Sequence, residues 1–91
     1  MKRLIVMNQQ GVERAAYVAR YFRAGEVRQQ PYLIIKFDGD ERHFITSDFV
    51  PNMRGCSFDE IVCSLQDSDE YGTEYFRPML ADRRGKLVIR D

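Results

Sequence analysis

Residues 31–47, PYLIIKFDGDERHFITS, contain two strand-like runs joined by a turn. The first run is apolar and β-branched, and it ends at Asp38-Gly39. This dipeptide is typical of a tight hairpin, because glycine tolerates positive φ angles and aspartate can hydrogen-bond its own backbone. We therefore predict paired antiparallel strands over residues 32–37 and 42–47. A lone hairpin is only marginally stable in water, so the rest of the chain is expected to cover one of its faces.

Two further strands and a long helix are predicted outside the hairpin. Residues 3–7 form a continuous apolar run, which is typical of a strand at the centre of a sheet, and residues 86–90 form another strand. Residues 10–24 carry one apolar stripe with the helical period and are followed by Gly25, which predicts a helix. Residues 26–30 and 48–55 are expected to be a polar link and a loop.

The second half of the chain contains a predicted short helix and an optional strand. Ser57 and Glu60 have the spacing of a capping box, which predicts a helix over residues 57–66. The acidic residues 67–72 are expected to end this helix. Residues 73–80 form an optional extra strand, and Pro78 would restrict that strand to an edge of the sheet.

The predicted order is β-α-β-β-α-β, with the optional strand before the last one. This order indicates an α+β fold, a two-layer sandwich with both helices on one sheet face. It matches the ferredoxin-like plan. The 91 residues are expected to form one domain, residues 1–91. Since that plan hosts many unrelated functions, function has to be argued from side chains.

The composition is that of a soluble globular protein, with 44% hydrophobic and 31% charged residues. No apolar run has the length of a transmembrane helix, and the apolar run that follows Met1 is too short for a signal peptide. We therefore expect a cytoplasmic protein without a membrane partner. Cys56 and Cys63 are expected to be free thiols, because seven residues along a helix separate them too far for a disulfide.

The formal net charge is zero, but the charges are unevenly distributed. Residues 1–36 have a net charge of +5, residues 37–76 of −8 and residues 77–91 of +3. Basic ends around an acidic middle indicate a charged partner without identifying it.

The sequence contains no motif for catalysis, metal binding or nucleotide binding. A catalytic set could be assembled from His43, Cys56 and Asp38, but nothing in their spacing supports one. Two cysteines and one histidine at these positions match no structural zinc pattern. The strand at residues 3–7 lacks the base-stacking aromatic residue of an RNA-recognition motif. We therefore expect no enzymatic activity, no cofactor and no metal.

Two segments contain residue types that are common in protein interfaces. Tyr17 and Tyr21 lie one helical turn apart, opposite the apolar stripe and beside Arg14. The alternative is that one or both tyrosines pack under the link at residues 26–30. Residues 67–76 are acidic and aromatic; here the alternative is a solvated segment with its aromatic rings in the core. The candidate protein-binding residues are Arg14, Tyr17, Tyr21, Asp67, Asp69, Glu70, Tyr71, Glu74 and Tyr75.

These observations predict a small non-enzymatic binding protein that acts through a protein–protein interface, as a monomer or a homodimer. By analogy in size and charge pattern, it would be an inhibitor of host nucleic-acid machinery, such as a phage or mobile-element product of the anti-CRISPR type. Its partner would then be a nucleic-acid-handling complex. The alternative is a nucleic-acid-binding or transcription-regulating module. Its basic surface would consist of Arg14, Arg20, Arg23, Arg28, Arg83 and Arg84.

Overall fold

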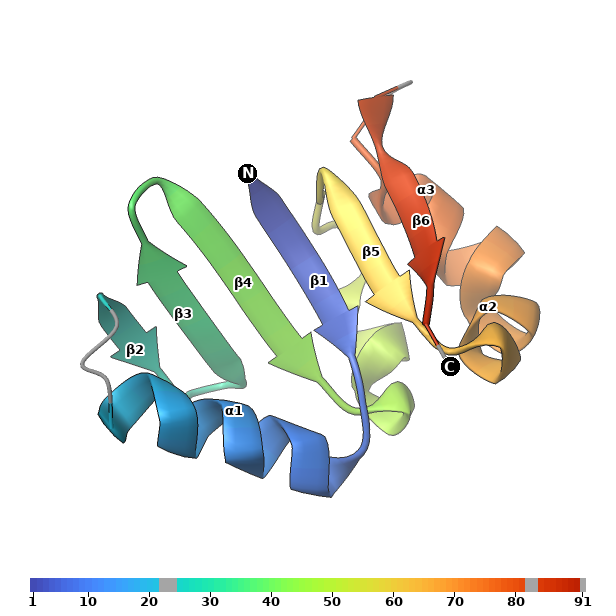
Figure 1. The fold of residues 1–91 in the computed structure, drawn as a ribbon. Coiled ribbons are helices and arrows are strands. Elements are labelled where there is room, and N and C mark those ends of the chain that lie inside the picture. Colours follow the sequence, from blue (N-terminus) through green and yellow to red (C-terminus); the bar gives the residue numbers. More distant parts are fainter. Residues whose placement is uncertain (22–24, 82–83, 91) are drawn as a thin grey trace.

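The protein is built on a six-stranded mixed sheet (Figure 1). The computed structural model describes residues 1–21, 25–81 and 84–90. The strands are β1 (Lys2–Val6), β2 (Glu26–Arg28), β3 (Leu33–Phe37), β4 (Asp40–Ile45), β5 (Glu60–Cys63) and β6 (Lys86–Ile89). Their order across the sheet is β2-β3-β4-β1-β5-β6. The four adjacent strands β4, β1, β5 and β6 are parallel to one another, whereas β3 pairs antiparallel with both β2 and β4.

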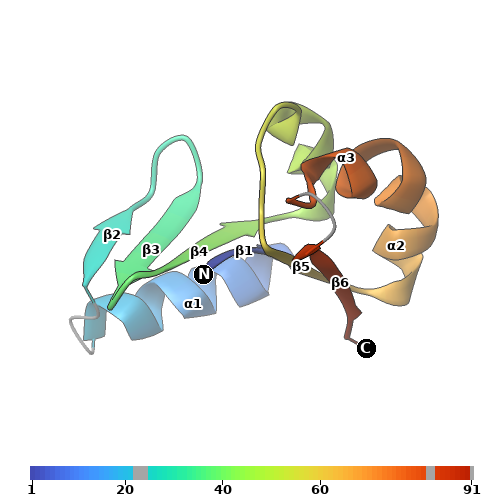
Figure 2. The same ribbon diagram turned by 90° about the horizontal axis from the view of Figure 1, so that it is seen from above.

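Helical segments cover parts of both faces of the sheet. They are α1 (Gln9–Tyr21), the 3₁₀-helix η1 (Ser47–Met53), α2 (Leu65–Tyr71), the π-helical turn η2 (Gly72–Phe76) and α3 (Arg77–Met79). Figure 2 shows α1 on one side of the sheet and η1, α2 and α3 on the other. We call the α1 side the front face and the opposite side the back face.

The direction of each crossover explains why the helices lie on opposite faces. The chain leaves β1 through α1 and the β2–β3 pair and arrives at β4, on one side of β1. It leaves β5 through α2, η2 and α3 and arrives at β6, which lies in the opposite direction. Parallel crossovers are almost always right-handed, so two crossovers in opposite directions place their helices on opposite faces.

The back face carries the larger apolar core. Leu4, from the central strand β1, and Ile61, from β5, are fully buried there against Phe58 and Phe76. The other buried members of this core are Val6, Ile45, Val50, Met53, Cys63 and Met79. The front core is smaller, since its buried members are Ala16, Leu33 and Phe44.

The predicted hairpin is confirmed. It is formed by β3 and β4, and its turn places Asp38 and Gly39 at φ angles of 47° and 80°. Positive φ at both positions is the geometry for which Asp-Gly is suited. The strands predicted at residues 3–7 and 86–90 are also confirmed within a residue or two, as β1 and β6. The long helix is α1; its predicted end at residues 22–24 lies outside the described residues.

The helix predicted at residues 57–66 is wrong. This segment contains the strand β5, and the capping residue of the next helix is Ser64, whose hydroxyl accepts a hydrogen bond from the Asp67 amide at 3.1 Å. The apolar run from Ile61 to Cys63 is instead a short strand in the parallel part of the sheet, where its neighbours β1 and β6 satisfy its backbone. Tertiary pairing therefore overrides the local signal at Ser57.

Two predictions about residues 67–80 are also wrong. The acidic residues 67–72 were expected to end a helix, but most of them form α2. The optional edge strand is absent, since residues 73–79 are helical in η2 and α3. Phe76 and Met79 are both buried, and a separation of three residues brings side chains to the same face of a helix. Pro78 lies in the first turn of α3, where its missing N–H is tolerated.

The remaining differences concern the topology. The polar link at residues 26–30 contains β2, which pairs with β3, and most of the loop at residues 48–55 is η1. The fold is α+β as expected, but the strand order differs from the ferredoxin-like plan. The expected placement of both helices on one face is wrong, for the crossover reason given above. No helix among the described residues is long and apolar enough to cross a membrane.

Candidate functional site

The outer face of α1 presents an aromatic arc. Tyr17 and Tyr21 are 69% and 70% exposed, and their rings stack with centroids 6.2 Å apart. At 100° per residue, Arg14 and Val18 lie on the same side of the helix as the two tyrosines. We call these four residues the α1 arc. Since both rings are exposed, the alternative in which they pack under residues 26–30 is wrong.

Small residues on one side of α1 pack against the sheet, and they explain why the aromatic side of the helix faces solvent. Ala16 and Ala19 are buried against the sheet, which allows the helix to approach it closely. The helix begins with a side-chain cap, because the Asn8 Oδ1 accepts a hydrogen bond from the Gly11 amide at 2.7 Å. The rotation set by this inner stripe therefore directs Tyr17 and Tyr21 into solvent.

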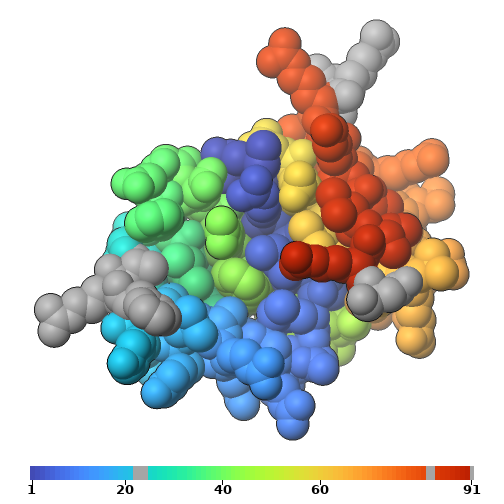
Figure 3. Space-filling view, in the orientation of Figure 1, coloured from blue at the N-terminus to red at the C-terminus, as the bar shows by residue number. Residues whose placement is uncertain are grey.

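A groove of about 540 Å³ lies between α1 and the front face of the sheet. Its apolar lining includes Met7, Val18, Ile35, Phe37 and Phe44, and its polar lining consists of Arg14, Asp40 and Arg42. We call it the front groove. In Figure 3, strands β4 (green), β1 (dark blue) and β5 (yellow) reach the surface beside α1 with no helix over them.

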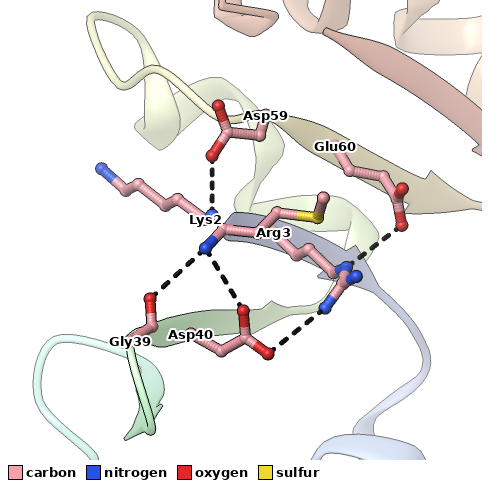
Figure 4. A network of polar contacts seen from close by, with 7 residues as sticks. Lys2, Arg3, Gly39, Asp40, Asp59 and Glu60 are labelled. Atoms are coloured by element: carbon pink, nitrogen blue, oxygen red, sulfur yellow. Dashed lines mark hydrogen bonds and ion pairs between the residues drawn. The ribbon is translucent and has the colours of Figure 1, made fainter.

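A network of polar contacts joins β1 to both neighbouring strands on this side (Figure 4). The Arg3 guanidinium lies 3.3 Å from a carboxylate oxygen of Glu60 and 3.9 Å from one of Asp40. The amino terminus of Met1 also pairs with Asp40, at 3.2 Å. The two carboxylates that face the front groove and its neighbourhood are therefore already paired with cations.

Arg3 is paired with carboxylates, whereas the two arginines of the front groove are not paired with any carboxylate of the described residues. Within the part of the chain that the structure describes, Arg14 and Arg42 are exposed and form no ion pair. The groove therefore combines an apolar lining with two positive charges at its rim.

The acidic-aromatic segment, residues 67–76, does not form a second continuous surface. Tyr71 and Tyr75 are half-buried and pack against the back core, and Asp67 is buried. Glu74 is exposed and pairs with Arg54 at 3.5 Å. Asp69 and Glu70 are exposed as well. The tyrosines of this segment thus agree with the second of the two predictions, in which the aromatic rings pack on the core.

The arginines of the alternative basic surface are not gathered in one place. Arg14 and Arg20 lie on α1, and Arg28 lies on the edge strand β2. Arg84 precedes β6, which forms the opposite edge of the sheet. Arg20 also forms a hydrogen bond with the Gln29 side chain. The remaining two candidates, Arg23 and Arg83, lie outside the described residues.

A buried polar cluster on the back face was not anticipated from the sequence. The His43 ring is buried, and its Nε2 lies 2.6 Å from the Glu41 carboxylate. Its Nδ1 lies 2.9 Å from the Tyr32 hydroxyl. A neutral imidazole fits these partners, with Nε2–H donating to Glu41 and Nδ1 accepting from the hydroxyl. Burial lowers the pKa of His43, and the hydrogen bond to His43 lowers the pKa of Glu41.

Several contacts hold the His43 ring in place. Both ring nitrogens of His43 are hydrogen-bonded, and the ring lies against Phe58 with centroids 5.1 Å apart. The carboxylate beside His43 comes from Glu41, whereas Asp38 lies in the hairpin turn. The cluster satisfies polar groups at the border of the back core.

The cysteines are both free, as expected. Cys63 is buried, and burial raises the pKa of its thiol to about 11, so this sulfur is protonated and unreactive at neutral pH. Cys56 is only half-buried. Across residues 1–21, 25–81 and 84–90, no three His, Cys, Asp or Glu side chains are grouped closely enough to hold a metal ion.

Comparison of the chain with protein families, with curated proteins and with solved structures finds no match among them. Function therefore has to be inferred from the surfaces described above. Of these, the α1 arc and the front groove share Arg14 and Val18, and together they include the exposed rings of Tyr17, Tyr21 and Phe37.

Proposed function

We propose that this chain is a small, non-enzymatic binding protein that recognises another protein through the α1 arc. The observation that carries the proposal is the exposed, stacked pair Tyr17 and Tyr21. A tyrosine outside the core offers a rigid apolar ring with a polar tip, so it buries area on a partner with little loss of side-chain entropy. Tyrosine and arginine are also enriched among the residues that dominate interface energies.

The surroundings of the tyrosine pair support the same proposal. Val18 is 45% exposed and Phe37 is 52% exposed, and both line the front groove beside the pair. Single exposed apolar side chains are common on monomeric proteins and need no explanation. Two exposed apolar side chains on one groove, next to a helix that also exposes two tyrosines, are more typical of a surface that a partner covers.

The acidic residues of α2 and η2 are the second candidates for the same function. Asp69, Glu70 and Glu74 are exposed, and they lie on the other side of the sheet from α1. They offer charge without exposed aromatic rings, because Tyr71 and Tyr75 pack on the back core. We therefore place them after the α1 arc, as the surface to examine if the arc proves inert.

A narrower hypothesis is that the partner is a nucleic-acid-handling complex, inhibited by this chain as by a phage or mobile-element product of the anti-CRISPR type. The small size and the acidic middle segment of the sequence support it by analogy. The identity of the captured partner tests this hypothesis separately from the location of the binding surface.

The experiment is a capture of partners with the tagged protein from a lysate of the source organism, followed by affinity measurements. Tyr17→Ala, Tyr21→Ala and Arg14→Ala are compared with the wild type. At least one should weaken the complex by about 2 kcal/mol or more, which is the usual threshold for an interface hot spot. Arg20→Ala is the matched control, since Arg20 is exposed on the same helix but outside the α1 arc. Unchanged affinity in all three variants would contradict the proposal.

Nucleic-acid binding is the alternative that the same preparation can test. Its expected signature is strong retention on DNA or RNA that falls steeply as salt is added, because phosphate contacts release counterions. We expect no such retention, since the described arginines of the predicted basic surface are distributed over α1 and both sheet edges.

A further inference from the structure

We infer that the front groove receives an amphipathic helix of the partner protein, with its apolar side chains between α1 and the sheet and its acidic side chains against Arg14 and Arg42. This inference rests on the proposed protein-binding function and adds the chemistry of the segment that binds. Three features of the front face carry it: an incomplete helical layer, a floor without free backbone groups, and a rim with two arginines that form no ion pair with the described residues.

The front layer has room for one more helix. In Figure 1, α1 runs across the lower ends of β2, β3 and β4, and the upper parts of these strands have no helix over them on the front face. Among the described residues, α1 is the only helix on this face. Side chains alternate along a strand, so Ile5 and Val62 point to the front while Leu4 and Ile61 are buried at the back. Ile5 and Val62 lie outside the lining of the front groove, and they are only partly buried although β1 and β5 each have a paired strand on both sides.

The partner segment is a helix because the floor of the groove offers side chains and no free backbone. The floor residues come from β3 and β4, which both lie inside the sheet with a paired strand on each side. A strand of a partner would need an open edge to pair with, whereas a helix packs through side chains alone. The 13 residues of α1 span about 20 Å, and a second helix beside it would pack at an interaxial distance of about 8–10 Å.

The charge of the rim selects an acidic helix. Asp40 is paired with the amino terminus and with Arg3, and Glu60 is paired with Arg3, so neither carboxylate neutralises the other arginines (Figure 4). Arg14 and Arg42 both line the groove and form no ion pair in the described part of the chain. A guanidinium group binds a carboxylate through charge-assisted hydrogen bonds, so Asp or Glu on both flanks of an apolar stripe complements this rim.

The first part of the test uses two synthetic helical peptides with the same leucine stripe. One peptide has glutamate at all flanking positions and the other has lysine, and the binding of each to the full chain is measured by fluorescence polarisation. The acidic peptide should bind about tenfold more tightly than the basic one, as expected for two exposed charge pairs gained in one case and repelled in the other. Equal binding of the two peptides, or no binding of the acidic one, would overturn the inference.

The second part locates the binding with charge reversal. Arg42→Glu should remove the preference for the acidic peptide, because Arg42 lies on the front side of β4 and lines the groove. Arg28→Glu is the matched control: this arginine is also exposed on a strand, but it pairs with Ile34 and points to the back face. Phe37→Asp should weaken both peptides, since Phe37 belongs to the apolar lining. If Arg28→Glu acts as strongly as Arg42→Glu, the preference reflects overall charge and the inference fails.

Other occupants of the groove give distinguishable results. Self-association of the protein that Phe37→Asp abolishes would assign the groove to a second copy of the chain and overturn the inference. Binding of a fatty acid such as dodecanoate, with no binding of the acidic peptide, would assign it to a small apolar carboxylate and overturn it as well. If the captured partner depends on Tyr17 while the peptides do not bind, the protein-binding proposal stands and only this inference is lost.

Discussion

The two faces of the sheet use similar side chains in different ways. On the back face, Phe58 and Phe76 are buried with the side chains of η1 and α3, and little of them meets solvent. On the front face, Phe37 and the tyrosine pair of the α1 arc are more than half exposed. Burial of apolar area is the main favourable term in folding, so the back face should contribute most of the stability. The front face retains apolar area that a partner can still cover.

The contrast between the two faces can be tested by truncating one isoleucine on each face, and this test has the largest expected effect. Ile61 is fully buried in the back core, whereas Ile35 is partly buried beside the front groove. Ile61→Ala should cost about 2–5 kcal/mol of unfolding free energy, as expected for a filled core. Ile35→Ala should cost about 1–2 kcal/mol, because part of its side chain already contacts water.

Chemical denaturation of both variants measures the two costs under the same conditions. If Ile35→Ala destabilises the protein as much as Ile61→Ala, the front core is as closely packed as the back core, and the groove is not available to a partner. If Ile61→Ala loses about twice as much unfolding free energy as Ile35→Ala, or more, the result would support the back face as the main source of stability.

An intermediate effect concerns the His43 cluster on the back face. Burial places the pKa of His43 in the folded state below its value in the unfolded chain, which is about 6.5. Between those two values the unfolded chain binds more protons, so acidification favours unfolding. This contribution to stability is complete above about pH 6.5 and is lost as the pH falls through the folded pKa. The lowered pKa of Glu41 has the same sign, and its contribution is lost as the pH falls below the ordinary value of a glutamate.

Unfolding experiments between about pH 8 and pH 5 test this, since that window contains the unfolded pKa of histidine. The unfolding free energy of the wild type should decrease toward pH 5. His43→Asn keeps hydrogen-bonding groups at this position but does not titrate, so its free energy should vary less with pH over the same interval. An increase in wild-type stability on acidification would mean that the imidazolium paired with Glu41 is the folded form.

Local signals in the sequence predict β1, α1, the β3–β4 hairpin and β6, but they miss β2 and fail for residues 57–80. The hairpin follows from Asp38-Gly39, and the outward rotation of α1 follows from the alanine stripe that contains Ala16 and Ala19. In the second half, the pattern at Ser57 resembles a helix start, yet Ser64 provides the actual cap. The run between these serines is too short to reveal its period, so only its pairing with β1 and β6 decides that it is a strand.

The candidate site was predictable in part for a similar reason. Helix periodicity alone places Tyr17 and Tyr21 outside the core, and the structure agrees with their exposure. The front groove exists because the connections between strands place α1 and the other helices on opposite faces of the sheet. No short segment of sequence encodes which face a connection takes. Phe37 and Arg42 therefore had no local signal that would assign them to one surface with α1. The Tyr32–His43 bond likewise depends on the register between β3 and β4 and on the path of the chain before β3.

The smallest expected effect concerns the α1 arc itself. Tyr17→Ala and Tyr21→Ala each remove a stacking contact between residues one turn apart, which is worth about 0.2–0.5 kcal/mol on a helix. Alanine has a higher helix propensity than tyrosine by a few tenths of a kcal/mol, up to about 0.7, so the two terms nearly cancel. The unfolding free energy should therefore change by less than about 0.5 kcal/mol, as for ordinary surface positions.

Denaturation curves of both variants, measured beside Ile61→Ala, check this. A loss of more than about 1 kcal/mol would place the tyrosines in the folded core, because exposed side chains rarely cost so much, and would remove the structural basis for the α1 arc as a binding surface.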